Sequence, residues 1–327
     1  MKVCIVGAGA IGGFIGTRLA RAGQAQVSAL ARGATLAALR TQGWRLRMGG
    51  ELLQAPATAS DSAAELGTQD LVIIALKGQA LPTLAPALAP LLGPGTVVLP
   101  AMNGVPWWFL HGVPGVGEAP LESVDPGGVI GAAIPFDRVL GGVVHASTST
   151  AEPGLVEHRM GQGLIVGEPA CGVSERAQRV SALLAHAGFD ASASANIRQD
   201  VWYKLWGNLT INPVSAITGA TADRILGDPL VRAFCSAAMG EVAAIGARIG
   251  CAIAQSPEDR HQITRKLGAF RSSMLQDVQA GRAIELDAIV GAVHEIARRI
   301  GQPASNVDAL FGLTRLFGRV HGLYPEA

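Results

Sequence analysis

Three polar side chains recur every four residues in a strongly apolar stretch of the chain: Lys204, Asn208 and Asn212. On a helix, this spacing places them on one face. Polar groups that face a core or a cleft must find partners, so the stripe indicates either a solvated helix face or a cleft for a small polar ligand. In a cleft, Lys204 would place a cation and a proton donor near an oxygen that gains negative charge.

A second polar group follows further along the chain. Ser272 and Ser273 open a segment that reaches Asp277, and Glu285 comes twelve residues after Ser273. Taken alone, the serines could cap a helix, and Glu285 could be a first-turn acid stabilised by the helix dipole. The alternative, a functional role for Ser273 and Glu285, stays open on the residues alone.

A glycine-rich motif, Gly7-Ala8-Gly9-Ala10-Ile11-Gly12, stands between an apolar run at residues 3–6 and a helix-compatible stretch that continues to Ala22. In a dinucleotide-binding loop the first glycine allows a tight turn, the second admits a pyrophosphate, and the third lets helix pack on strand. The helix N-terminus supplies amide donors for the phosphates. Glycine is frequent here, at 42 of 327 residues, so a structural turn is the alternative. The position of the motif favours dinucleotide binding.

The residues beyond the motif predict the cofactor. A site for NAD usually has an acidic residue at the end of the second strand, yet residues 1–50 contain no Asp or Glu. Arg32 stands just past the expected second strand, where its guanidinium could bind a 2′-phosphate; the alternative is a solvated loop residue. We therefore expect NADPH. Lys77 and Asn103-Gly104 follow the third and fourth expected strands, at the edge where such sheets bind ligands, although a solvent-facing lysine and a plain turn are alternatives.

The elements that must position these residues change in character along the chain. Up to about residue 195, short β-rich runs alternate with Ala- and Leu-rich stretches, which is typical of βαβ units on a mostly parallel sheet. The expected strands are residues 2–6, 27–31, 71–76, 96–99, 129–134, 142–148, 164–167 and 189–194. Residues Gly112–Gly128, rich in Gly and Pro, indicate a long loop inserted before a strand.

From Asn196 on, long segments with helical periodicity replace this alternation, notably Pro229–Ile249, Ile284–Ile300 and Ser305–His321. We therefore expect an α/β N-terminal Rossmann-type domain plus an all-α C-terminal domain. The expected NADP-binding domain covers residues 1–195, and the expected helical substrate and catalytic domain covers residues 196–327. A chain of 327 residues fits two domains.

Composition excludes several partners. With 26 Lys and Arg against 25 Asp and Glu, the chain has no global field for binding nucleic acid or an anionic membrane. The most apolar window, Ala80–Met102, contains five prolines that a membrane-spanning helix would not tolerate. The N-terminal apolar run is too short for a signal peptide, and four scattered cysteines suggest neither disulfides nor a metal site. We expect a cytoplasmic protein, with a homodimer left open.

Several motifs, in the same order along the chain, resemble those of the ketopantoate reductase family, also called 2-dehydropantoate 2-reductases. They are Gly7–Gly12, Leu76-Lys77, Met102-Asn103-Gly104, Trp202-Tyr203-Lys204-Leu205, Asn208, Ile211-Asn212-Pro213, Ser273-Met274-Leu275-Gln276-Asp277 and Glu285. The resemblance runs nearly end to end. It implies a Rossmann-type domain joined to a helical domain, with the active site in the cleft between them. It also implies NADPH-dependent reduction of a small 2-keto acid, ketopantoate, to pantoate in pantothenate and coenzyme A biosynthesis.

The resemblance also implies residue roles. Lys204 would be the general acid that protonates the forming alkoxide, and Glu285 would hold the substrate's hydroxyl end or help to position Lys204. Asn208, Asn212 and Ser273 would bind the substrate, while Lys77 and Asn103 would lie beside the nicotinamide and the substrate. A nearby glutamate raises a lysine's pKa and desolvation lowers it; sequence alone leaves the balance open.

One departure from the family pattern concerns the substrate. Asn103-Gly104 is followed by Val105-Pro106-Trp107-Trp108 and then by the Gly/Pro-rich stretch, whereas familiar members have a shorter, less aromatic connection. The aromatic pair either anchors the loop by packing or reshapes the substrate mouth. Two alternative functions follow: a related 2-keto acid or opine-type dehydrogenase with another substrate, and a non-catalytic NADPH-sensing regulator.

Overall fold

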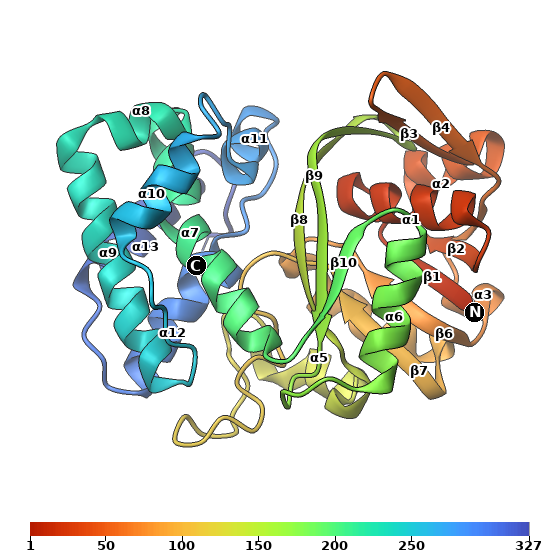
Figure 1. Cartoon of the computed structure of the whole chain (residues 1–327), viewed down its shortest axis with the longest axis horizontal. Coiled ribbons are helices and arrows are strands. Elements are labelled where there is room, and N and C mark those ends of the chain that lie inside the picture. Colours follow the sequence, from red (N-terminus) through yellow and green to blue (C-terminus); the bar gives the residue numbers. More distant parts are fainter. Residues whose placement is uncertain (327) are drawn as a thin grey trace. The chain divides into compact units, whose positions relative to one another are not determined.

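The computed structural model describes residues 1–326, and these divide into two compact units. The first unit comprises Met1–Met102 and Gly127–Asp200. The second comprises Asn103–Pro126 and the described residues from Val201 on. The first is built on two sheets and the second on helices, coloured from green to blue in Figure 1. The predicted fold class, an α/β Rossmann-type domain plus an all-α domain, is confirmed.

A parallel five-stranded sheet forms the base of the first unit, in the order β5-β2-β1-β6-β7. Its strands are β1 (Lys2–Val6), β2 (Gln26–Leu30), β5 (Thr58–Ser60), β6 (Gln69–Ile74) and β7 (Leu92–Pro100). Strand β1 lies at the centre, and Val3, Cys4, Ile5 and Val6 are all fully buried. A strand covered on both faces is expected to be continuously apolar. The sequence predicted four of these strands; β5 is too short and polar to have been recognised.

A second five-stranded sheet completes the unit. It has the order β10-β9-β3-β4, with β8 also paired with β9. Its strands are β3 (Trp44–Met48), β4 (Glu51–Ala55), β8 (Gly141–Glu152), β9 (Leu155–Gly167) and β10 (Asp190–Ser194); β8 and β9 form the long antiparallel pair in Figure 1. We did not predict β3 and β4, although their connection, Gly49-Gly50, has positive φ at both residues and is a typical hairpin turn.

Helix α1 (Ala10–Ala22) packs against the second sheet through its glycines. A Cβ on Gly13 would approach Val156 of β9 to 2.6 Å, and one on Gly16 would approach the Trp44 ring of β3 to 2.5 Å. Larger residues would therefore separate the helix from the sheet. The glycine-rich stretch thus serves packing as well as the turn after β1.

The first unit has two further helices of ten or more residues, α2 (Gly33–Gln42) and α6 (Glu175–His186). Its other helices are short: α3 (Ala63–Leu66), α4 (Leu81–Leu84) and α5 (Val129–Ala133). Helix α5 corrects our expectation of a strand at residues 129–134. A short apolar run fits a strand and a buried helical turn equally well, and this one packs against the 3₁₀ segment Ala85–Leu91.

The second unit is assembled around helix α7 (Ile197–Thr218), whose first residues belong to the first unit. The other helices are α8 (Ala222–Gly227), α9 (Pro229–Arg248), α10 (Pro257–Arg265), α11 (Ser273–Gln279), the π-helical segment η5 (Asp287–Gly291), α12 (Ala292–Arg299) and α13 (Ser305–Val320). Trp202 and Trp206 of α7 donate their indole N–H groups to the carbonyls of Val242 and Met239 on α9, at 3.3 and 2.8 Å. These bonds allow large aromatic groups to be buried without losing a hydrogen bond.

Two segment boundaries differ from the expected ones. The segment Asn103–Pro126, which we placed in the N-terminal domain, groups with the helices. The expected helix Ile284–Ile300 begins only at Leu286, and residues 282–285 before it have no regular secondary structure. The domain ranges 1–195 and 196–327, with the binding functions assigned to them, stay predictions.

One described helix, α9, is long and apolar enough to cross a membrane by length and composition alone. One of its faces, including Cys235, Met239 and Val242, is buried.

Candidate active site

The glycine-rich loop has the geometry of a dinucleotide cradle. Gly7 has φ of +89°, and a Cβ there would meet the Leu76 side chain at 2.4 Å. A Cβ on Gly12 would lie 1.9 Å from the carbonyl oxygen of Gly7. At Gly9, by contrast, a Cβ would meet no protein atom within 4 Å, and no side chain caps the helix N-terminus that follows. The open space beside Gly9 and the uncapped amides of α1 therefore fit a bound pyrophosphate.

The other residues assigned to the cofactor follow strands of the same sheet. Arg32 is an exposed residue at the N-cap of α2, directly after β2, and Lys77 is the N-cap of the 3₁₀ turn that follows β6. Because β1, β2 and β6 are parallel, their carboxyl ends lie at one edge. Gly7 donates to the carbonyl of Leu30 at 3.0 Å, and Ala75 donates to that of Val6 at 2.9 Å. These bonds hold the turns that follow β1, β2 and β6 next to one another.

Lys204 and Asn103 form the centre of the polar cluster in the second unit. The ammonium Nζ of Lys204 donates to Oδ1 of Asn103 at 2.9 Å. An ammonium has three donors, so two remain for other acceptors. The sequence placed each residue in a functional site, and the structure brings them together across 101 positions of the chain.

The turn at Gly104 holds Asn103 in place. Gly104 has φ of +80°, and a Cβ there would lie 2.4 Å from the carbonyl oxygen of Ala288 in η5. The next residue, Val105, donates its N–H to that same carbonyl at 2.7 Å. A π-helical turn has an altered hydrogen-bonding pattern and is frequent at functional sites. Here the turn supplies the carbonyl against which the Asn103 loop is held.

The electrostatic surroundings of Lys204 answer the question that the sequence left open. Burial of its ammonium group lowers the pKa of Lys204 to about 8, and the negative charge of Glu285 opposes that shift. Desolvation therefore has the larger effect. A lysine with a pKa close to neutral pH is mostly protonated at pH 7 and transfers its proton readily, which suits a general acid.

Asn212 and Ser273 also approach each other. The Asn212 side-chain amide lies 3.5 Å from Oγ of Ser273, the first residue of α11. The preceding serine, Ser272, is the N-cap of that helix: its hydroxyl accepts from the N–H of Leu275 and bonds with the hydroxyl of Ser215 on α7. Ser272 therefore has the capping role, and Ser273 stays available for a ligand. Asn208 lies on α7 between Lys204 and Asn212 in the stripe.

The aromatic pair after Asn103 anchors its segment by packing. Trp107 and Trp108 are buried, and the adjacent Phe109 stacks on Trp202 of α7, with ring centroids 5.7 Å apart and planes at 19°. Trp202 precedes Lys204 by two residues. The stack therefore ties the Asn103 segment to the same helix that carries the lysine.

Two charged residues of α12 hold the far end of the same segment, and our sequence reasoning missed them. Glu295 accepts from the N–H groups of Glu122 and Ser123 at 3.0 and 2.9 Å. Arg299 donates to the carbonyl of Ala119 at 2.7 Å and pairs with Glu295. The sequence shows a Glu and an Arg four residues apart, which predicts a helical ion pair. It does not show that the pair binds the backbone of a segment about 170 residues earlier.

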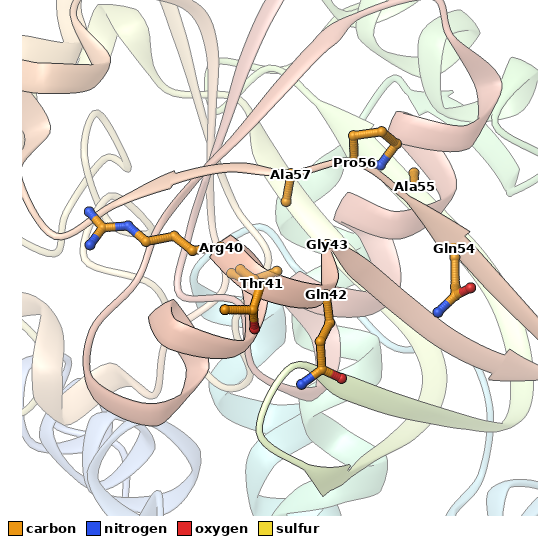
Figure 2. Close-up of a pocket in the computed structure, with 9 residues that line it drawn as sticks. Arg40, Thr41, Gln42, Gly43, Gln54, Ala55, Pro56 and Ala57 are labelled. Carbon is orange, nitrogen blue, oxygen red and sulfur yellow. The ribbon is translucent and has the colours of Figure 1, made fainter.

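A hollow of about 470 Å³ in the first unit is separate from all of these residues. It lies between the end of α2 and the strand connection at Ala55–Ala57, and Figure 2 shows Arg40 and Gln54 extending away from each other along its border. None of the predicted site residues lines it. The candidate site thus consists of two sets. Gly7–Gly12, Arg32 and Lys77 lie in the first unit, and the Lys204 cluster lies in the second.

The fold, an α/β domain plus a helical domain, is that of an oxidoreductase family. The family model described as ketopantoate reductase PanE/ApbA matches residues 3–170, and that of its C-terminal domain matches residues 196–317. The chain belongs to the ketopantoate reductase family, whose members use a nicotinamide cofactor. The predicted resemblance is confirmed.

Individual relatives agree with this assignment. A 2-dehydropantoate 2-reductase of Mesorhizobium japonicum is 42% identical over 99% of this chain and its own full length. The crystal structure of a provisionally named ketopantoate reductase from Ralstonia solanacearum MolK2 is 53% identical, with a TM-score of 0.95 over 99% of both chains. A D-mandelate dehydrogenase bound to NADH and anilino(oxo)acetate is 19% identical, with a TM-score of 0.84 over 99% of this chain and all of its own. That likeness concerns the fold alone.

Proposed function

We propose that this protein is an NADPH-dependent 2-dehydropantoate 2-reductase that converts ketopantoate to pantoate. The proposal depends on one observation: a member of the ketopantoate reductase family has a buried lysine, Lys204, that bonds with Asn103. A lysine with a pKa lowered to about 8 is oriented by Asn103 at 2.9 Å, with the charge of Glu285 acting on it. The full-length relative named 2-dehydropantoate 2-reductase supports the same substrate.

A nicotinamide cofactor held by Gly7–Gly12, Arg32 and Lys77 would supply a hydride to the keto carbon. The keto oxygen gains negative charge as the hydride arrives, and the Lys204 ammonium stabilises this charge and then transfers a proton to the oxygen. Asn103 Oδ1 accepts a hydrogen bond from one of the three ammonium N–H groups. The remaining two are therefore directed to other acceptors, one of which is the substrate oxygen in this proposal.

The remaining residues of the cluster would bind the rest of the substrate. Asn208, Asn212 and Ser273 offer amide and hydroxyl donors for the carboxylate and the oxygens of a 2-keto acid. We assign Glu285 to the distal hydroxyl of ketopantoate, with a second effect on the pKa of Lys204 through its charge. These assignments rest on the family pattern and on the proximity of Asn212 to Ser273.

NADPH is proposed over NADH because Arg32 directly follows β2 and residues 1–50 contain no carboxylate. In the first unit, Lys77 would lie toward the nicotinamide, at the same sheet edge as Gly7 and Arg32. None of the four cysteines is in a disulfide, and burial raises the pKa of Cys4 and of Cys235 to about 11. Thiols that form no disulfide fit the reducing cytoplasm, where we place the enzyme; a homodimer stays a prediction.

A steady-state assay of NADPH oxidation tests the proposal, with ketopantoate compared with other branched 2-keto acids. We expect ketopantoate to be the preferred substrate. The variant Lys204→Ala should lower kcat by about 10² to 10⁴ while the Kd for NADPH changes little. Near-normal turnover by the variant would place the acid elsewhere, with Lys77 the next candidate. NADPH binding without turnover of any 2-keto acid or opine would favour a sensing regulator.

A further inference from the structure

The C-terminal tail folds back onto the segment that carries Glu285. The N–H of Ile284 donates to the carbonyl of Leu323 at 3.0 Å. The N–H groups of Leu323 and Tyr324 both donate to the carbonyl of Gly318 on α13, at 2.7 and 3.2 Å. A Cβ on Gly318 would lie 2.7 Å from Cβ of Tyr324, so this close approach requires glycine. The tail is thereby bonded to α13 on one side and to Ile284, the residue before Glu285, on the other.

Tyr324 also makes a partly buried side-chain contact with Asp287, the first residue of η5. Its phenol Oη donates to Oδ1 of Asp287 at 2.5 Å. Burial, together with this hydrogen bond, raises the pKa of Tyr324 well above its ordinary value. Burial also raises the pKa of Asp287, whereas the bond from Tyr324 acts to lower it. The phenol therefore keeps its proton, and Asp287 has a donor that offsets the cost of burying its carboxylate.

From Asp287 a short series of contacts leads to Lys204. Asp287 begins the π-helical segment, and the next residue, Ala288, accepts the N–H of Val105 at 2.7 Å. The adjoining Gly104 packs on the same carbonyl, and Asn103 accepts from Lys204 at 2.9 Å. On its N-terminal side, Asp287 is separated from Glu285 by Leu286 alone. The two groups that act on Lys204, Asn103 and Glu285, are therefore both supported by the segment that Tyr324 contacts.

We propose that Tyr324 is a positioning residue for the reduction, which holds Glu285 and the Asn103 turn in place through its hydrogen bond to Asp287. The inference deepens the proposed function and rests on it for its catalytic readout. Leu323 contributes its backbone carbonyl to the same support. Tyr324 itself touches neither Lys204 nor the substrate in this proposal, and its effect on the chemistry is indirect.

The variant Tyr324→Phe removes one oxygen and leaves the ring in place. We expect kcat to fall at least about fivefold, while the Kd for NADPH stays within twofold of the unmodified protein. The matched control is Tyr203→Phe, the other tyrosine of the chain, whose hydroxyl bonds with Gln255 at 2.7 Å. The control should keep kcat within twofold. An effect of Tyr324→Phe no larger than that of the control overturns the proposal.

A double-mutant cycle separates positioning from general loss of stability. If Tyr324 acts through Asp287, then Asp287→Ala should lower kcat to a similar extent, and the double variant should be no worse than the more impaired single variant. If the loss of kcat in the double variant equals the product of the two single losses, Tyr324 and Asp287 act independently, and the proposal is overturned. If circular dichroism shows that Tyr324→Phe does not fold, Asp287→Ala tests the positioning role instead. A kcat of Asp287→Ala within twofold of that of the unmodified protein would refute this role.

A titration of Lys204 provides a readout that does not depend on turnover. The chain has four lysines, so their ε-carbon resonances can be followed by NMR, and Lys204→Ala assigns the signal. Displacement of Asn103 or Glu285 removes favourable interactions with the ammonium, so the pKa of Lys204 should be lower in Tyr324→Phe. An unchanged titration refutes the positioning role. If the unmodified enzyme reduces no ketopantoate but the pKa still falls, the proposed function fails and the positioning role survives.

Discussion

Removal of the acceptor from Lys204 should move the pH dependence of the reduction to lower pH. The variant Asn103→Ala deletes the amide oxygen that lies 2.9 Å from the ammonium. A hydrogen bond to a charged group contributes about 1.5 to 3 kcal/mol, and one pKa unit corresponds to about 1.4 kcal/mol. If water restores about half of the lost interaction, the pKa of Lys204 falls by about one unit, from its value of about 8.

The sign follows from the role of the lysine. Reduction requires the protonated form, so kcat/KM for ketopantoate is retained below the Lys204 pKa and lost as the pH rises through it. With the pKa moved to about 7, the protonated fraction at pH 8 drops from about one half to about one tenth, whereas at pH 6 it stays near unity. Relative to the unmodified protein, the kcat/KM of Asn103→Ala for ketopantoate should therefore fall about fivefold more at pH 8 than at pH 6.

The assay is kcat/KM for ketopantoate as a function of pH at saturating NADPH, since this ratio reports the pKa before the substrate binds. The matched comparison is Asn103→Asp. A carboxylate at this position adds negative charge beside the ammonium and should raise the pKa of Lys204. Both variants alter the substrate contacts of residue 103. Only a change in the pKa of Lys204 would move the inflection points of the two pH profiles in opposite directions. Identical inflections in the unmodified protein and both variants would refute the coupling between Asn103 and Lys204.

Three further outcomes test other parts of the site. We expect the unmodified protein to bind NADPH more tightly than NADH by about 2 kcal/mol, and Arg32→Ala should remove most of this difference. Cofactor titration measures both affinities, with Arg40→Ala as the control. Equal binding of the two cofactors by the unmodified protein would contradict the assignment of Arg32. Ketopantoate should exceed 2-ketoisovalerate, which lacks the hydroxymethyl group, at least about tenfold in kcat/KM, and Glu285→Ala should narrow that gap; a preference for 2-ketoisovalerate or an aromatic keto acid rules out ketopantoate. Gly104→Ala should lower the Tm more than Gly112→Ala, because both have positive φ but only Gly104 packs against backbone; we expect about 2 to 4 kcal/mol of destabilisation, and equal Tm values for the two variants would contradict it.

The amino-acid sequence by itself determined the local features of this protein. The Gly7–Gly12 loop was predictable because a tight turn, a close helix and an open approach each require glycine over a few adjacent residues. The parallel strands and long helices followed from apolar periodicity, and Lys204, Asn208 and Asn212 were placed on one face by helical spacing alone. Residues 129–134 were assigned wrongly because a short apolar run has no period that distinguishes a strand from a helical turn.

The tertiary structure decided which distant residues meet. Nothing in the local sequence indicates that Asn103 bonds with Lys204, or that Asn103–Pro126 groups with the helices rather than with the strand before it. From sequence, Trp107 and Trp108 fit either a packed anchor or a reshaped substrate mouth; in the structure both are buried, and the adjacent Phe109 stacks on Trp202. Likewise, nothing in the sequence around Tyr324 indicates that its hydroxyl bonds with Asp287, two residues after Glu285. Such contacts depend on how whole elements pack, because burial and partner geometry arise only when segments far apart in the chain come together.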